Sequence, residues 1–260
     1  MTTWARYGAN AVLSKARQVL SLVADLVWPP VSPLSGEDVR RTGELSPGDW
    51  SKITFIDAPQ CERCGLPFPY PVGDGAVCGV CAAREPAYDA ARSAFVYDDD
   101  SRSLVLGFKH GGRTDVLAAF GRWMARAGRV RLSEADCIMP VPLHPRRLRA
   151  RRFNQSLLLA RALSRASGVR VDAHALKRRR ATPTQAGRSA KGRVRNVAGA
   201  FQVRQRARAR LRGARIILVD DVHTTGATLE ACARALKRCG AADVTAITLA
   251  RVVKPADPLK

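Results

Sequence analysis

The stretch IILVDDVHTTGAT, residues 216–228, decides the fold of this chain. Its four apolar residues, three of them β-branched, predict a short strand that is buried on both faces. Asp220 and Asp221 follow where such a strand would leave its sheet. A polar turn comes next, and LEACARALKRCG then predicts a helix that Gly240 closes. The pattern indicates an open α/β sheet, in which ligands bind outside the carboxyl ends of the strands.

The turn has the chemistry of a sugar-phosphate site. Two carboxylates accept hydrogen bonds from vicinal hydroxyls or hold a divalent ion, and threonine hydroxyls with helix N-terminal N–H groups wrap a phosphate. Gly226 lets the backbone approach that phosphate closely. The turn has no lysine in Walker A spacing, so a nucleoside triphosphate fits less well. The alternative is an ordinary strand, turn and helix, with the two acids pointing to opposite faces.

Almost all of the net charge of +22 lies in one segment. Residues 140–215 contain 22 basic residues and a single acid, Asp172, whereas residues 1–139 contain 16 of each sign. Such a segment attracts polyanions, either nucleic acid or a densely phosphorylated small molecule. An arginine-rich genome would instead spread basic residues evenly, which the balanced first half contradicts.

Four of the seven cysteines form two CxxC pairs, separated by thirteen residues. This spacing brings four thiolates within tetrahedral reach of one Zn²⁺, and Gly65 and Gly79 permit the tight turns that the two knuckles need. A redox pair would need only one CxxC within a thioredoxin-like βαβ unit. We therefore expect a closed, structural zinc site formed by Cys61, Cys64, Cys78 and Cys81.

The remaining elements are read from apolar periodicity, and no internal repeat is evident. No apolar run approaches ~18 residues, so no membrane span is expected, and charges in the first 25 residues argue against a secretory signal. The cytoplasm is the default compartment. We predict helices over residues 5–28, 103–108, 114–129 and 154–168, strands over 94–97, 136–142, 201–203 and 243–252, irregular chain over 29–60, and a long loop over 177–200.

Two basic connections flank the predicted sheet. Lys109, His110 and Arg113 form either a basic loop near an anion or a solvated loop, and the sequence leaves both open. Residues 143–152 place His144 and five arginines beyond the strand at 136–142, on the same edge as Asp220 if the sheet is parallel. His144 has no evident nucleophile partner, so we expect it to contact a ligand or to be structural.

Residues 216–228 resemble the PRPP-binding signature of type I phosphoribosyltransferases. The resemblance implies that Asp220 and Asp221, the catalytic candidates, face the ribose hydroxyls of phosphoribosyl pyrophosphate (PRPP), which is normally bound with Mg²⁺. It also implies that the loop holds the 5′-phosphate through Thr224, Thr225, Gly226, Ala227 and Thr228.

PVPLHPRR, RRFNQSLLLARAL, RRRATPTQAGRSAKGRVRNVAGAF and IILVDDVHTTGAT occur in the order typical of the ComF family, which includes GntX-like proteins. Its members are phosphoribosyltransferase-like proteins linked to competence for DNA uptake. The resemblance implies an α/β fold of the phosphoribosyltransferase type, with a mostly parallel central sheet flanked by helices. Arg146, Arg147 and Arg152 would lie on the pyrophosphate side, and residues 178–195 would form a flexible hood.

The domain boundaries that follow are 1–58 for an N-terminal helix and irregular segment, interpreted as a degenerate first zinc knuckle, 59–86 for the zinc knuckle, 87–253 for the phosphoribosyltransferase-like domain, and 254–260 for a tail. Many members of the family carry two further CxxC pairs near the N-terminus. Here Ser32, Ser35, Ser46 and Asp49 stand at those positions. Serine is a poor zinc ligand, so we predict one zinc per chain and a loosely held segment over residues 29–57.

Three functions remain open at this point. The first is a PRPP-binding phosphoribosyltransferase-like protein, linked to DNA uptake or to nucleotide metabolism. The second is a basic accessory protein that binds single-stranded DNA or another nucleic acid without transferase turnover; Phe153 and Phe201 are the only aromatic residues of the basic segment, so stacking platforms are sparse. The third is a PRPP sensor. Proteins of the competence machinery are candidate partners, and the acceptor base or amine is not specified.

Overall fold

The computed structural model describes residues 29–110, 112–144, 148, 153–180, 197 and 199–253, apart from the side chain of His110. The chain divides into two compact units, residues 1–51 and 52–260. The helix predicted over residues 5–28, most of the predicted hood, the tail, and Arg146, Arg147 and Arg152 all lie outside the described residues. No helix in the described ranges is long and apolar enough to span a membrane.

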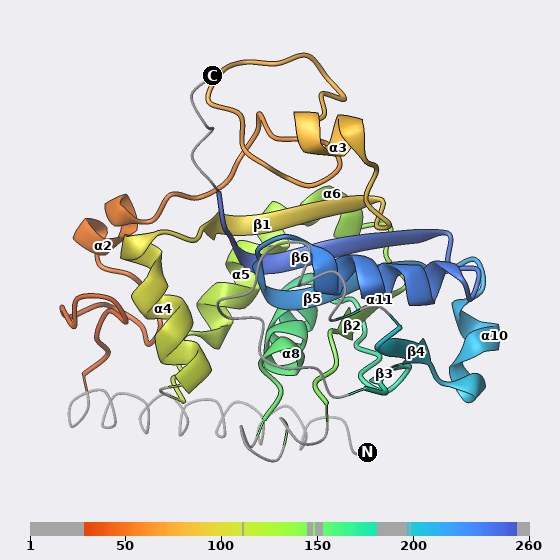
Figure 1. Cartoon of the computed structure of the whole chain (residues 1–260). Coiled ribbons are helices and arrows are strands. Elements are labelled where there is room, and N and C mark those ends of the chain that lie inside the picture. Colours follow the sequence, from red (N-terminus) through yellow and green to blue (C-terminus); the bar gives the residue numbers. More distant parts are fainter. Residues whose placement is uncertain are drawn as a thin grey trace, which may run out of the picture. The chain divides into compact units, whose positions relative to one another are not determined.

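A four-stranded parallel sheet forms the centre of the second unit (Figure 1). Its strand order is β1-β6-β5-β2, so the strand of the opening motif lies inside the sheet. Short pairing continues beyond both edges, at Phe55 with Phe95 of β1 and at Val171 with Ile138 of β2. The strands are β1 (Ala90–Val96), β2 (Cys137–Pro140), β5 (Arg215–His223) and β6 (Asp243–Arg251).

Alternating side chains of the sheet serve two helical layers. Ile216 and Leu218 of β5 belong to the core that contains α11, whereas Ile247 of β6 packs beneath Gly128, between α5 and α6. Figure 1 shows α11 crossing the strands of this sheet. The helices of this unit are α3 (Gly79–Ala83), α4 (Asp99–His110), α5 (Leu117–Ala127), α6 (Arg129–Leu132), α8 (Gln155–Ser167), α10 (Arg208–Leu211) and α11 (Ala227–Lys237).

Helix α8 follows the sequence signals closely. Asn154 caps it by accepting a hydrogen bond from the Ser156 N–H, and Gly168 closes it in the left-handed conformation at φ 78°. Gly121 allows α5 to lie against α8, because a Cβ there would come within 2.5 Å of the Ala162 carbonyl oxygen. α8 is thereby fixed beside β2 and β5, which brings its first turn to the carboxyl ends of those strands.

Several predicted boundaries are wrong. β5 continues through Asp220 and Asp221 to His223, because these residues keep their ladder with β6 at Thr248, Ala250 and Arg251. β1 starts four residues before the predicted strand at 94–97. The start of the predicted long loop is also regular: β3 (Leu176–Arg178) pairs antiparallel with β4 (Phe201–Val203).

Residues 29–51 form a ribbon rather than irregular chain. Val31 and Asp38 pair in an antiparallel bridge, and helix α2 (Pro47–Lys52) follows. A ribbon of the same kind spans residues 59–84, with an antiparallel bridge between Gln60 and Pro67 and with helix α3. We name them the first ribbon (residues 29–51) and the second ribbon (residues 59–84). The chain therefore contains a structural repeat. The prediction that it has no internal repeat is wrong, because the two copies share few side chains.

Candidate functional site

The carboxylates of Asp220 and Asp221 lie at the carboxyl end of β5, each held by a side chain from another element. Ser156 Oγ, in the first turn of α8, donates to Asp220 Oδ1 at 2.9 Å. Lys109 Nζ, near the end of α4, lies 2.9 Å from Asp221 Oδ2. This ion pair places Lys109 beside the acidic pair, whereas Arg113 pairs with its neighbour Asp115.

The surroundings of Asp220 perturb its titration. Its pKa is raised to about 7, chiefly because the surrounding protein withdraws the carboxyl group from water and also because Asp221 is close. Hydrogen bonds from the Ser156 hydroxyl and the Asp221 N–H act in the opposite direction. Above about pH 7 this carboxyl group is ionised and accepts hydrogen bonds from ligand hydroxyls, and below about pH 7 it holds a proton.

The loop TTGAT, residues 224–228, turns directly from β5 into α11. Gly226 is the residue before the helix and adopts φ 72°, and no side chain caps α11. The hydroxyl oxygen of Thr225 is buried and has no hydrogen-bond partner among the described residues. Together with Asp220, four residues of the TTGAT loop line one small concavity, namely Thr224, Gly226, Ala227 and Thr228.

Gly226 must be glycine for a second reason, which lies beneath the loop. A Cβ at this position would come within 2.9 Å of His223 Nε2 and 3.3 Å of Tyr88 Oη. The His223 ring is buried at the end of β5, where Arg251 Nη1 lies 2.8 Å from its Nδ1. Burial and the charge of Arg251 lower the pKa of His223 to about 3, so the ring is neutral. It is a packing and hydrogen-bonding group rather than a proton carrier.

A larger cavity of about 340 Å³ lies at the amino ends of β2 and β5. Several of its charged groups already have partners: Arg210 binds Asp172 at 2.5 Å, and Arg170 Nε donates to the Asp136 carbonyl. This cavity lies away from the carboxyl ends of the strands, and α10, one of the helices that line it, has only 4 residues. Despite its smaller concavity, the carboxyl end of β5 is therefore the stronger candidate site.

The predicted zinc ligands meet in the second ribbon. The sulfur atoms of Cys61, Cys64, Cys78 and Cys81 are buried and all lie within 4.8 Å of one another. Backbone N–H groups of Cys64 and Cys78 point at the Cys61 sulfur, at 3.5 and 3.2 Å. Four converging sulfurs with N–H donors around them suit a closed Zn²⁺ site, whose role is structural. The donor set thus fits the metal that the spacing predicted.

The first ribbon places its four corresponding residues together as well. Asp49 is buried, and its Oδ2 accepts hydrogen bonds from Ser32 Oγ at 2.6 Å, Ser35 Oγ at 2.5 Å and Ser35 N–H at 2.9 Å. Ser46 Oγ accepts from the Asp49 N–H at 3.2 Å. The cluster is a closed set of hydrogen bonds without a thiolate.

Four contributors to the site were missed in the sequence. Ser156 was visible as a polar residue in the first turn of a helix that starts at the site, which is a usable signal. His223 lay inside the opening motif but was given no role. Tyr88 and Arg251 gave no signal in the sequence. The contact of Tyr88 with His223 and that of Arg251 with Cys64 each join residues more than 130 positions apart.

Comparison with known proteins agrees with this geometry. A phosphoribosyl transferase domain model matches residues 154–259, and a double zinc ribbon domain model matches residues 23–82. The double zinc ribbon explains the structural repeat, and its match covers both ribbons. The phosphoribosyl transferase match covers α8, β5, the TTGAT loop, α11 and β6, which form the site described above.

Relatives extend over most of the chain. DNA utilization protein YhgH of Escherichia coli is 34% identical over 220 residues, which cover 80% of this chain and 94% of that protein. Competence protein F of Haemophilus influenzae is 32% identical, with 74% and 85% covered. Competence protein ComFC of Bacillus subtilis is 30% identical, with 77% and 81% covered. With its phosphoribosyl transferase domain and zinc ribbon, this chain belongs to the ComF family of DNA utilization and competence proteins.

Proposed function

We propose that this chain binds PRPP at the carboxyl end of β5 and transfers its phosphoribosyl group. One observation carries the proposal: the Asp220 carboxylate, with Asp221 next to it in the chain, and the uncapped start of α11 meet at a single concavity, beside a buried Thr225 hydroxyl without a partner among the described residues. An unpaired buried hydroxyl is costly, and a phosphate oxygen is the acceptor that this position fits.

The roles within the site follow from the positions of its groups. Gly226 and the first N–H groups of α11 face the 5′-phosphate, and Asp220 and Asp221 face the ribose hydroxyls. Carboxylate oxygens are also ligands that Mg²⁺ prefers, so the same pair suits a Mg²⁺ bound with the pyrophosphate. In the transfer, the C1′–oxygen bond to pyrophosphate breaks as the acceptor bonds to C1′ and releases its proton. The chain positions the ligand and stabilises the leaving charge.

Calorimetric titration with PRPP and Mg²⁺ tests the proposal. We expect wild type to bind and the double variant Asp220→Asn/Asp221→Asn to lose at least about tenfold in affinity, because each amide weakens a charge-assisted hydrogen bond. Asp243→Asn is the matched control, since this residue lies at the start of β6, away from the carboxyl ends of the strands, and its carboxylate accepts from Thr245. Equal binding by wild type and the double variant would remove the proposal.

The pH dependence of binding and of stability provides a second check on Asp220. Its pKa rises from 3.8 to about 7 in the folded chain, so ligand affinity should fall as the pH drops below about 7 and the carboxyl group takes up a proton. Stability changes in the opposite direction: the folded chain holds this proton more tightly, so stability decreases as the pH rises from about 4 to about 7. Asp220→Asn should remove this decrease, which urea unfolding at pH 5 and pH 8 would measure.

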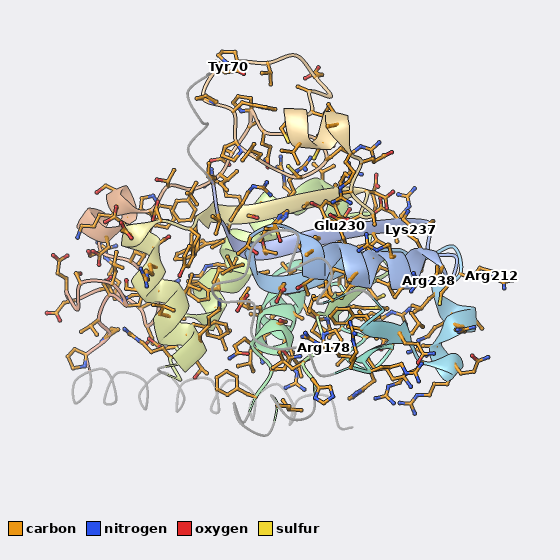
Figure 2. All side chains as sticks on the ribbon, in the orientation of Figure 1. Tyr70, Arg178, Arg212, Glu230, Lys237 and Arg238 are labelled. Atoms are coloured by element: carbon orange, nitrogen blue, oxygen red, sulfur yellow. The ribbon has the colours of Figure 1, made fainter. Side chains whose placement is uncertain are left out.

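Nucleic-acid binding is the second candidate, and one feature of the surface favours it. Exposed arginines surround the larger cavity and continue along α10, where Figure 2 labels Arg212. Phe201, one of the two aromatic residues of the basic segment, is buried, so binding would depend on backbone phosphates rather than on stacked bases. The relatives' names, which refer to DNA utilization and competence, agree with such a partner.

A salt series with a fluorescent single-stranded oligonucleotide tests this candidate. The logarithm of affinity should fall steeply with the logarithm of salt concentration. Replacing Arg206, Arg208 and Arg212 by glutamine should reduce that slope by up to about one for each phosphate that the variant no longer neutralises. Asp220→Asn/Asp221→Asn should leave the slope unchanged. A flat salt response would exclude phosphate contacts as the basis of binding.

A further inference from the structure

A chain of contacts joins the zinc cysteines to the underside of the TTGAT loop. Arg251, the last residue of β6, donates from Nη1 to the Cys64 carbonyl and from Nη2 to the Cys64 sulfur at 3.3 Å. The same Nη1 lies 2.8 Å from His223 Nδ1. His223 Nε2 in turn lies 3.5 Å from Tyr88 Oη, and both atoms lie beneath Gly226. Every member of this chain is buried.

The chemistry of the guanidinium fixes the direction of these hydrogen bonds. Arginine only donates, so His223 Nδ1 must accept. The ring is neutral and its remaining proton therefore lies on Nε2, toward Tyr88. Arg251 thus selects the tautomer of His223, as an outer partner does for a metal-bound histidine. The ring that supports Gly226 is held in one orientation from the side of the zinc cluster.

The charge of Arg251 also needs an explanation. A buried cation is stable only when a partner balances it. Arg251 is 7% exposed, and none of its contacts described above is to a carboxylate. Four thiolates outnumber the charges of one Zn²⁺, so the loaded cluster is anionic and supplies that balance through Cys64. Arg251 is therefore matched to the zinc-loaded second ribbon.

A second contact joins the same two regions on the surface. Arg84, the residue after α3, binds Glu230 of α11 through both of its terminal nitrogens, at 3.1 and 2.5 Å. Glu230 is buried, and Figure 2 labels it on α11. The zinc cysteines and residues of α11 also share one apolar core. The second ribbon therefore contacts the first turn of α11 through Arg84 and Glu230. It also reaches the underside of the TTGAT loop through Arg251 and His223.

We propose that Arg251 and His223 are positioning residues: they hold the TTGAT loop against the zinc-loaded second ribbon, which thereby sets the loop in its phosphate-binding conformation. The proposal deepens the proposed function and rests on it for the identity of the ligand. The link between the zinc cysteines and the TTGAT loop does not depend on the identity of the ligand, because it consists of contacts within the chain. Loss of the link should loosen residues 222–230 before it affects the rest of the sheet.

Hydrogen exchange on the zinc-loaded full chain tests the link without any ligand. We expect His223→Asn and Arg251→Met to raise exchange at residues 222–230 by about tenfold or more, while zinc content stays at one per chain. Arg92→Met is the matched control: Arg92 also joins the second ribbon to the sheet, through Glu62, but it does not reach the loop. The control should exchange as wild type does at residues 222–230.

The outcomes separate this proposal from the proposed function. Unchanged exchange at residues 222–230 in zinc-loaded His223→Asn overturns the proposed positioning role. If Arg251→Met loses zinc or fails to fold, the result for His223→Asn alone is decisive, since the hydrogen bonds of His223 are to Arg251 and Tyr88 and not to a cysteine. PRPP with Mg²⁺ is then titrated against the same proteins. If wild type fails to bind, the proposed function fails while the exchange result still stands. If wild type binds and His223→Asn binds at least about tenfold more weakly, both proposals are supported.

Discussion

The two ribbons of this chain have the same backbone and different centres. In the first ribbon four residues with oxygen side chains meet at Asp49, and in the second ribbon four sulfurs meet as a metal site. Four backbone hydrogen bonds correspond: Ser32–Glu37, Gly36–Ser32, Val39–Pro30 and Trp50–Ser46 in the first ribbon match Cys61–Leu66, Gly65–Cys61, Phe68–Pro59 and Ala82–Cys78 in the second, all between 2.7 and 2.9 Å.

This correspondence shows that the ribbon backbone does not require a metal at its centre. A single carboxylate oxygen that accepts three hydrogen bonds takes the place of four metal–sulfur bonds in the first ribbon. This replacement lowers the contribution of the centre to the stability of the first ribbon, because hydrogen bonds each contribute about 1 kcal/mol net whereas structural zinc contributes on the order of 10 kcal/mol. It also removes any dependence on zinc supply. The ribbon with the four-sulfur centre is the one that binds α11, through Arg84 and Glu230.

Removing the metal should produce the largest difference between the ribbons. A strong chelator, or Cys64→Ser, should unfold the second ribbon and lower the melting temperature of the unit that contains the sheet, since the metal's binding energy is part of that unit's folding energy. Elemental analysis should give one zinc per chain before treatment. Hydrogen exchange in residues 30–50 should not change, because the first ribbon has no thiolate.

Two results would contradict this view of the centres. A zinc content of two per chain would mean that the first ribbon binds metal through Ser32, Ser35, Ser46 and Asp49. A content of zero in protein purified without chelator, with the second ribbon still protected from exchange, would mean that the four thiols pack without metal. Cys239→Ser is the control for thiol loss, because Cys239 is only partly buried and lies outside the cluster.

Restoring thiolates to the first ribbon should convert it into the second kind. The quadruple variant Ser32→Cys, Ser35→Cys, Ser46→Cys and Asp49→Cys recreates two CxxC pairs on a backbone that already has the required turns. We expect two zinc ions per chain under reducing conditions, measured by elemental analysis. A content that stays at one would show that the two backbones differ more at their centres than their hydrogen bonds indicate.

Removing the hub of the first ribbon should have a smaller, local effect. Asp49→Ala leaves two serine hydroxyls and one N–H without their acceptor, which should cost about 3 kcal/mol of local stability. Exchange at residues 32–39 should rise accordingly while zinc content and PRPP binding stay unchanged. Asp49→Asn keeps an acceptor oxygen and should fall between wild type and Asp49→Ala. An equal effect on the second ribbon would show that the centres are not independent.

The sequence predicted the second ribbon, the sheet and the carboxyl-end site because each has a local signature. CxxC spacing, apolar runs and a strand–acid–turn–helix pattern depend on neighbouring residues, and Cys61, Asp220 and Gly226 were identified from them. The first ribbon was wrongly predicted to be irregular, because serines and an aspartate in proline-rich chain are also typical of loops. Its order depends on Asp49 meeting residues fourteen and seventeen positions away, which no local pattern records.

The support beneath the site could not be predicted for the same reason. Lys109 and Ser156 reach the carboxylates from helices that precede β5 in the sequence by many residues. Arg251 lay in a predicted strand, and Tyr88 was given no role. Their roles arise only in the folded chain, where the pairing of β6 with β5 places Arg251 opposite His223. Arg251 also binds Cys64 there, and Tyr88 Oη lies 3.5 Å from His223 Nε2. Sequence periodicity fixes which residues are buried, but not which distant residues they meet.

The glycine that follows each first ligand pair allows the finest comparison of the two ribbons. Gly36 and Gly65 both have positive φ, 79° and 68°. A Cβ on Gly65 would come within 2.4 Å of the Ala91 carbonyl oxygen, whereas a Cβ on Gly36 meets nothing within 4 Å.

Gly36→Ala should therefore cost only the left-handed strain of about 1 kcal/mol, measured by exchange at residues 32–39. Gly65→Ala adds a backbone clash and should cost about 2 kcal/mol more in the second ribbon, even with zinc bound. Equal costs would mean that the second ribbon moves away from β1 freely, and a ribbon held that loosely would not position the TTGAT loop as proposed.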